Sequence, residues 1–174
     1  MKYNIAVACA AALSLAVFST QAHDGRVYVT GTITDNTCTL SPDSQDMTVD
    51  MGAVSNRQFL HPGEGANWQS FVIDLQNCGA TAIGVTVSFN GAANTYDHDL
   101  LALTPGAGAA AGIGIALYDH EKKAIPLGSE SALIALSANQ ASAQLQFYAR
   151  YIADGGAVMS GVANASATFI LNYE

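Results

Sequence analysis

The sequence predicts an all-β fold, an antiparallel β-sandwich. Two observations predict it: apolar and polar residues alternate with a period of two through most of the chain, and turn-forming residues separate the alternating runs. A period of two puts every second side chain on one face of a strand, as in a sheet that packs on one side. The runs that we expect to be strands are 27–34, 71–76, 85–89, 113–117, 145–151 and 163–173.

The segments between these runs are predicted to be turns rather than linkers, as in Ser41-Pro42-Asp43 and in 154–156. The stretch 133–146 is rich in alanine, but its serine and asparagine residues favour an irregular connection over a helix. The only compositionally biased segment is 106–114. Because no domain boundary is visible, we expect one domain.

The first 22 residues have the pattern of an export signal. Lys2 supplies a positive start, an apolar run extends from Ile5 to Phe18, and Thr20-Gln21-Ala22 forms a small-x-small cleavage site. A transmembrane anchor is the alternative, but the run is shorter than the roughly 18 to 20 residues that span a bilayer. We therefore expect residues 1–22 to be removed and the mature chain to begin at His23, which leaves a chain of single-domain size.

The composition is acidic and weakly charged. The chain is 50% hydrophobic and 11% charged, with 14 acidic and 6 basic residues, and Lys2 leaves with the signal. Nucleic acids and anionic lipid surfaces both require clustered Lys and Arg. The charge balance therefore argues against both kinds of partner.

Two of the three cysteines, Cys38 and Cys78, remain after Cys9 leaves with the signal. In an oxidising compartment they are predicted to form a disulfide, which would stabilise the fold by about 3 to 4 kcal/mol in the chain-entropy model. A zinc site is the alternative, but without a C-x-x-C or a nearby histidine the pair is a poor zinc signature.

No arrangement of residues makes a case for catalysis, a cofactor or a metal. The segment Gly106 to Ala111 matches the relaxed dinucleotide pattern G-x-G-x-x-A, but a strand pattern follows it where a helix should begin. A copper or zinc sandwich enzyme would need converging histidines, and the chain has no H-x-H pair. His98, between Asp97 and Asp99, is interpreted as part of a solvated loop, and no G-x-S-x-G elbow is present.

The N-terminal run is the first of two informative ends. Its small and apolar residues fall on one face of an extended segment and would contribute about 1.5 to 3 kcal/mol for each buried Val or Ile. That face consists of Gly25, Val27, Val29, Gly31 and Ile33. Taken alone, this pattern favours an ordinary first strand of the chain's own sandwich.

The C-terminal run alternates as far as the last residue, Glu174. In a seven-strand immunoglobulin-like order the last strand would have a further partner, and no residues remain here to supply one. A sandwich without that strand would expose an apolar groove and unpaired backbone groups, which proteins normally cover. A strand donated by another subunit would cover them.

The chain resembles the pilins of chaperone-usher pili, and within them the minor tip adaptors of type 1 fimbriae. The resemblance covers essentially the whole mature chain. Gly161, fourteenth from the end, and the penultimate Tyr173 match the C-terminal chaperone-recognition pattern of the family. The segments that carry the resemblance are 31–38, 47–52, 71–78, 100–103, 112–117, 125–127, 147–150 and 164–169.

The resemblance implies an incomplete immunoglobulin-like sandwich that lacks its final strand. A periplasmic chaperone would hold the subunit first, and the N-terminal extension of the next subunit would then complete it, a case of β-augmentation. Gly25, Val27, Val29, Gly31 and Ile33 fall where donor residues enter the groove, and Gly31 marks where exchange with the chaperone strand begins. The strand that would edge the groove and pair with the chaperone carries Ala163, Ala165, Ala167, Phe169, Leu171 and Tyr173, while the terminal carboxylate of Glu174 would meet basic chaperone residues.

The implied organisation is a signal peptide (1–22), a donor extension that runs into the first strand (23–37) and a pilin domain (38–174). The expected partners are the periplasmic chaperone, the outer-membrane usher and neighbouring subunits, with no small-molecule substrate. The protein would pass through the periplasm to an extracellular fimbrium and contribute to cell adhesion through the fibre.

The short distance from His23 to Cys38 resembles tip adaptors, because rod subunits carry a longer stretch before the first cysteine. The alternatives are a major rod pilin, a terminating subunit, an autonomous exported adhesin module and, last, a secreted metalloenzyme.

Overall fold

The computed structural model describes residues 27–33 and 35–174. They belong to two units, one ending at Ile33 and one spanning 34–174. The expected signal peptide 1–22, the mature start His23 and the donor residue Gly25 lie outside the described residues.

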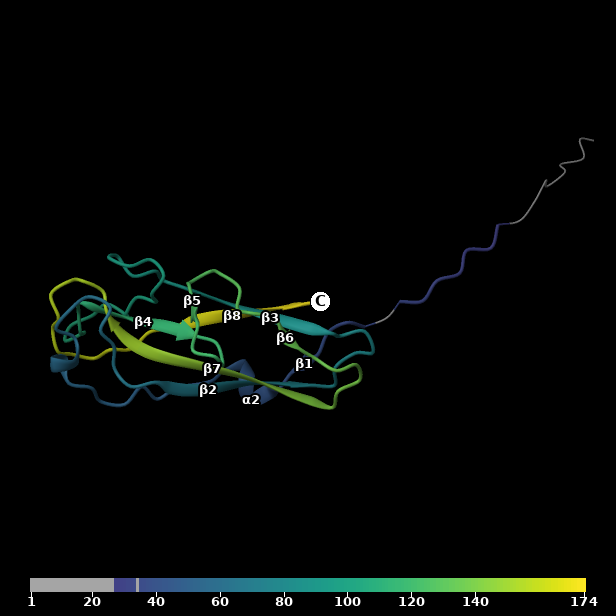
Figure 1. Ribbon diagram of the computed structural model, residues 1–174, viewed down its shortest axis with the longest axis horizontal. Helices are drawn as coiled ribbons and strands as arrows, with labels where there is room; N and C mark the ends of the chain where they lie inside the picture. Colours follow the sequence, from purple (N-terminus) through teal and green to yellow (C-terminus); the bar gives the residue numbers. More distant parts are fainter. Residues whose placement is uncertain (1–26, 34) are drawn as a thin grey trace, which may run out of the picture. The chain divides into compact units, whose positions relative to one another are not determined.

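The larger unit is built from two antiparallel sheets (Figure 1). One sheet has the order β1-β2-β7-β4-β5 and the other the order β6-β3-β8. A single four-residue α-helix and one 3-10 turn accompany the strands in the described part of the chain. The elements are β1 (Thr39–Leu40), α2 (Pro42–Gln45), η1 (Asn56–Gln58), β2 (Gln69–Gln76), β3 (Gly84–Gly91), β4 (Ile113–Tyr118), β5 (Ala124–Ile125), β6 (Ile134–Ala135), β7 (Ser142–Ala153) and β8 (Ala167–Tyr173).

The strand order is immunoglobulin-like. In the seven-strand immunoglobulin order, strands A, B, E and D form one sheet and C, F and G form the other. Here β1, β2, β7 and β4 occupy the positions of A, B, E and D, and β3 and β8 those of C and F. No described strand occupies the position of G, beside β8. The predicted all-β, immunoglobulin-like sandwich is confirmed.

The core lies between the two sheets and follows from the alternation. Along β7 every second residue is buried, from Ala143 to Ala153, because that face points to the opposite sheet. Phe147 at its centre is fully buried, stacks on Phe71 at a centroid distance of 5.7 Å and meets Phe89 edge-on at 5.3 Å. Rings from both sheets thus interdigitate around β7.

A disulfide joins Cys38 to Cys78, as the sequence predicted. Cys38 precedes β1 and Cys78 follows β2, so the bond ties together two segments that are already neighbours in the sheet. Beside it, the backbone of Asp35 passes so close to Gly79 that an added Cβ would lie 2.0 Å from the Asp35 carbonyl oxygen. Only glycine fits there.

Five of the six predicted strands are present, with shifted boundaries. The strand expected at 163–173 begins only at Ala167. Of the residues before it, Asn164 is hydrogen-bonded to a loop instead of to β3, since its carbonyl accepts from the Thr104 N–H at 2.7 Å. The stretch expected to be irregular, 133–146, contains the short strand β6 and the start of β7. Residues 27–33 form no strand.

Candidate strand-acceptor groove

Strand β8 is hydrogen-bonded along one edge only. It pairs with β3 from Ala167 to Tyr173, and no described strand pairs with its other edge. The Glu174 N–H donates to the Gly84 carbonyl at 3.0 Å, and this bond shows which residues of β8 are hydrogen-bonded to β3. Because antiparallel hydrogen bonding alternates, the N–H and C=O groups of Phe169, Leu171 and Tyr173 point away from β3. The open edge can therefore bond a further strand.

The same residues direct their side chains towards the core but are only half-buried. Phe169, Leu171 and Tyr173 contact the main core cluster, whereas the residues between them are exposed. Ala163 and Ala165 continue this half-buried face, although they precede β8. Ala167 is exposed. The face from Ala163 to Tyr173 forms one wall of what we call the acceptor groove.

A second wall comes from the segment 38–54, which joins β1 to η1. Its half-buried apolar residues, Cys38, Leu40, Met47, Met51 and Val54, also pack against the core. Apart from the two residues of β1, this segment has no regular strand pairing with the sheet. It therefore offers the groove apolar side chains rather than a completed strand ladder.

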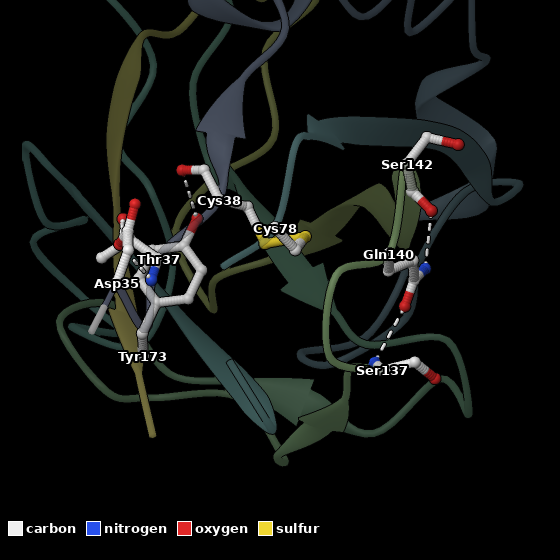
Figure 2. Close-up of a disulfide and its surroundings, with 8 residues drawn as sticks. All are labelled: Asp35, Thr37, Cys38, Cys78, Ser137, Gln140, Ser142 and Tyr173. Atoms are coloured by element: carbon white, nitrogen blue, oxygen red, sulfur yellow. Dashed lines mark hydrogen bonds between the residues drawn. A yellow bond between two sulfur atoms is a disulfide. The ribbon is translucent and has the colours of Figure 1, made fainter. Parts of the chain in front are cut away.

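Tyr173 closes one end of the groove, beside the disulfide. Its hydroxyl donates to the Cys38 carbonyl at 3.2 Å, and Figure 2 shows the ring between β8 and the Cys38 segment. Asp35 in turn accepts hydrogen bonds from the backbone N–H and the hydroxyl of Thr37. The pKa of Tyr173 is raised, chiefly by burial and to a smaller extent by the nearby Asp35 charge, while its hydrogen bond to Cys38 acts in the opposite direction.

A cavity of about 370 Å³ marks the other end of the groove. It lies between the two walls and is lined by Gly52, Val54 and Phe59 on one side and by Gly161 and Ala163 on the other, among others. The mixed polar and apolar lining is open enough to admit an aliphatic side chain.

Gly161 lets the loop 106–111 approach this end closely. An added Cβ would lie 2.4 Å from the Gly108 carbonyl oxygen and 2.5 Å from the backbone of Ala109. The adjacent Ala163 carbonyl accepts a hydrogen bond from the Tyr151 hydroxyl at 2.7 Å. Burial and, secondarily, the Asp50 charge raise the pKa of Tyr151, so the hydroxyl stays protonated as a donor. The segment 106–111 is thus packed directly against the backbone at Gly161.

The N-terminal unit presents its alternating side chains to solvent. Val27, Val29 and Ile33 are 90%, 91% and 101% exposed, and Tyr28 is 81% exposed. Gly31 has open space where a Cβ would be. Three large aliphatic side chains in such a short segment are therefore left without burial.

The described residues contain no group of three or more His, Cys, Asp or Glu side chains that could hold a metal. Among the described helices, none is long and apolar enough to cross a membrane.

Comparison with known proteins identifies the family. The model of the family described as "Fimbrial protein" matches residues 27–174, which is most of the chain. The chain belongs to the fimbrial protein family.

Two curated relatives extend the match over nearly the full length. The chain is 34% identical to long polar fimbria protein A of Salmonella typhimurium over 174 residues, covering 99% of this chain and 97% of that protein. It is 39% identical over 153 residues to the fimbrial-like protein YcbV of Escherichia coli K12, covering 88% of each.

A solved structure supports the same assignment. A chain of a chaperone-usher pilus, whose structure was used to explain rod uncoiling, is 25% identical, with a TM-score of 0.65 and coverage of 89% of this chain and 98% of that one. The protein is thus a structural subunit of chaperone-usher fimbriae, which lie on the outside of the cell. The resemblance stated from the sequence is confirmed at this level.

The structure brings together most of the residues that were predicted to edge the groove. Phe169, Leu171 and Tyr173, with Ala163 and Ala165, share one groove wall, and Gly161 lies at its end. Ala167 is on the same strand but exposed. The donor and chaperone roles of these residues, and the boundary between extension and domain at residue 38, stay predictions.

The second wall of the acceptor groove and its cavity were not predicted from the sequence. The signal for the wall was present, because Met47, Val49 and Met51 alternate with Thr48 and Asp50. The cavity had no such signal, since its lining comes from segments as far apart as Gly52 and Asn164.

Proposed function

We propose that this chain polymerises by donor-strand exchange, with the segment Gly25–Ile33 of one subunit added to the open edge of β8 in its neighbour. The observation that carries the proposal is the half-buried face of Phe169, Leu171 and Tyr173, whose outward backbone groups have no strand partner among the described residues. Burying apolar surface and satisfying those backbone groups would both favour addition of a strand.

The donor segment has the length and pattern that such a groove requires. Its nine residues span about 30 Å when extended at about 3.3 Å per residue, similar to the wall from Ala163 to Tyr173. Sheets of this sandwich are antiparallel, so a donor that runs antiparallel to β8 has its C-terminal end near Ala163. Ile33 would then enter the 370 Å³ cavity, and Gly25 would lie near Tyr173.

We infer that a periplasmic chaperone covers the same edge before assembly. The chain would reach the periplasm through the signal 1–22, and the chaperone would bind along β8 as far as Glu174. The cavity at the Gly161 end offers a place where Ile33 could enter while a chaperone strand still occupies the Tyr173 end. The usher would then release the growing fibre to the cell surface.

Within the fibre, we propose the position of a minor tip adaptor. The short spacing between His23 and Cys38 supports this position. The second candidate is a rod subunit, which is favoured by the likeness to a chain of a pilus studied for rod uncoiling. The amount of this chain relative to the main fimbrial protein in sheared fibres separates them: an adaptor is present at a few copies per fibre, a rod subunit at most positions.

A strand-exchange experiment tests the donor role. A peptide of residues 23–37 is offered to the chaperone-bound subunit and to candidate neighbours, and displacement of the chaperone is followed by native electrophoresis. Aspartate at Val27 or Val29 should abolish exchange, because these side chains would enter the groove. Aspartate at Thr30 or Thr32 is the matched control, since those side chains would face solvent.

Equal effects at inward and outward positions would contradict the donor register. If a subunit lacking 25–33 still entered fibres and passed on growth, the donor role itself would be wrong. A purified mature subunit that is stable alone and never associates would instead favour an autonomous adhesin module.

A further inference from the structure

The outer face of the five-stranded sheet carries a group of aromatic and basic side chains, here named the Trp68 cluster: Trp68, Tyr118, Lys122, Tyr148 and Arg150. Trp68 precedes β2, Tyr148 and Arg150 lie on β7, Tyr118 ends β4, and Lys122 follows in the turn before β5. Their side chains point outward because the residues that alternate with Tyr148 and Arg150 on β7 are buried in the core. The cluster is therefore on the face opposite to the core.

The rings form a packed base. Trp68 meets Tyr118 edge-on at a centroid distance of 4.4 Å and Tyr148 at 6.1 Å. Tyr118 and Tyr148 are also direct partners in the β4–β7 ladder. Burial raises the pKa of Tyr118, and the Arg150 charge opposes that rise, so the Tyr118 hydroxyl is a neutral donor and acceptor.

Arg150 is fixed against this base. Its guanidinium carbon lies 4.6 Å from the centroid of the Trp68 ring, a cation–π contact. On its other side is Gly65, where an added Cβ would lie 2.4 Å from a terminal guanidinium nitrogen. Glycine at position 65 thus leaves the space that the guanidinium fills.

Lys122 brings a second positive charge to the same ring. Its Nζ lies 5.2 Å from the Trp68 centroid and 5.3 Å from the Tyr148 centroid. Lys122 has a φ of 63°, in the left-handed region, at the turn that directs it back over β7. Two cations therefore share one indole ring.

Neither cation has an acidic partner among the described residues, although acidic residues outnumber basic ones by 14 to 6 in the whole chain. The one ion pair among the described residues joins His61 to Glu64. The Nε of Arg150 is buried without a hydrogen-bond acceptor, and no hydrogen bond to the other guanidinium nitrogens is found within 35–174. Such an unsatisfied buried donor is rare in folded proteins, and an ordered water or an ion is one of its ordinary explanations.

We propose that the Trp68 cluster binds a carboxylate-bearing sugar, such as a sialic or uronic acid. Arg150 and Lys122 would hold the carboxylate, which accepts charge-assisted hydrogen bonds from a planar guanidinium. The tyrosine hydroxyls and ring edges would contact the hydroxyls and C–H groups of the sugar. The site would give a fimbrial subunit a contact of its own with an acidic glycan, apart from its role in assembly.

A sugar fits the charge of the molecule better than a second copy of the chain. The full chain has a formal net charge of −8, and loss of Lys2 with the signal makes the subunit more negative, so docking a second copy at this cluster would bring two negatively charged chains together. A single acidic sugar brings one carboxylate to two cations without that repulsion. The aromatic rings of the Trp68 cluster also match a sugar better than they match the side chain of a single aspartate.

The test uses fimbriae that contain the subunit, passed over surfaces that carry sialyllactose, a galacturonic acid trimer, lactose or a glutamate-rich peptide. We expect binding to one or both acidic sugars, little binding to lactose, and a decrease as salt increases. Arg150→Gln should weaken acidic-sugar binding at least tenfold. Arg57→Gln, which removes the same charge on η1, is the matched control and should change nothing.

Gly65→Ala separates position from charge, because it displaces the guanidinium while leaving the net charge intact, and it should weaken binding as Arg150→Gln does. Should Arg150→Gln or Gly65→Ala fail to enter fimbriae, Lys122→Gln decides, since Lys122 is exposed; we expect at least a threefold loss, with Lys123→Gln as control. Unchanged binding in the Lys122 and Arg150 variants, equal binding to lactose, or binding to the acidic peptide alone would overturn the proposal.

Discussion

Strands β7 and β8 alternate equally well in sequence but differ in burial. The inward residues of β7 are nearly inaccessible, with Phe147 at 0% and Leu145 at 1% exposure, whereas Phe169 and Leu171 of β8 are only half-buried. β7 pairs with β2 on one side and β4 on the other, while β3 is the one described strand that pairs with β8. Alternation therefore marks a face for burial, and the number of neighbouring strands decides how far that face is buried.

The N-terminal unit has the reverse property. Val27, Val29 and Ile33 alternate as those of β8 do, yet they are exposed. One region thus offers apolar side chains without a surface to cover them, and the other offers a surface without a covering strand. Substitutions can test this contrast between β7, which is paired along both edges, and β8, whose second edge has no described partner strand.

The largest effect is expected at the centre of β7. Phe147→Ala should destabilise the donor-peptide-completed subunit by about 3 to 5 kcal/mol, because it leaves a cavity between the rings of Phe71 and Phe89. Urea denaturation measures the loss. A cost below about 1 kcal/mol would mean that β7 is not the centre of the core.

Replacing both Cys38 and Cys78 by serine should cost about 3 to 4 kcal/mol in the chain-entropy model. Since Cys38 also starts one groove wall, the affinity for the donor peptide should fall as well. The measurements are unfolding in urea and peptide titration. Lower stability with unchanged peptide affinity would show that the bond does not order the groove.

Phe169→Ala should cost about 1 to 2 kcal/mol in the subunit without a donor, where this side chain is half-buried, and more once the donor peptide is bound. The same variant is measured in both states by denaturation. Ile170→Ala, on the exposed face of β8, is the control and should show a smaller difference between the states. Equal costs of Phe169→Ala in both states would contradict the acceptor groove.

The smallest effect concerns pH. Because burial raises the pKa of Tyr173 above its ordinary value of 10.0, the neutral phenol contributes stability that is full below that value and is lost as pH rises through the folded pKa. Tyr173→Phe should therefore lose less stability between pH 9 and 11 than the unchanged chain, as followed by thermal unfolding. Tyr96→Phe, at an exposed residue, should lose as much as the unchanged chain.

The all-β fold class, most of the strand positions and the Cys38–Cys78 disulfide could all be predicted from the sequence. These depend on local alternation and on which residues remain after the signal peptide is removed, and both can be read directly from the linear sequence. It also marked 27–33 and 163–173 as unusual ends, although residues 163–166 are not part of β8 and Asn164 is hydrogen-bonded to a loop.

Only the tertiary structure decided which alternating faces are completed. β7 and β8 have the same pattern, but the sequence does not state how many neighbours each strand has. The same holds for the cavity beside Gly161 and for the Trp68 cluster, in which Trp68 and Arg150 are 82 positions apart by their numbers. Such contacts form because strand pairing sets distant residues side by side, and no local periodicity encodes that pairing.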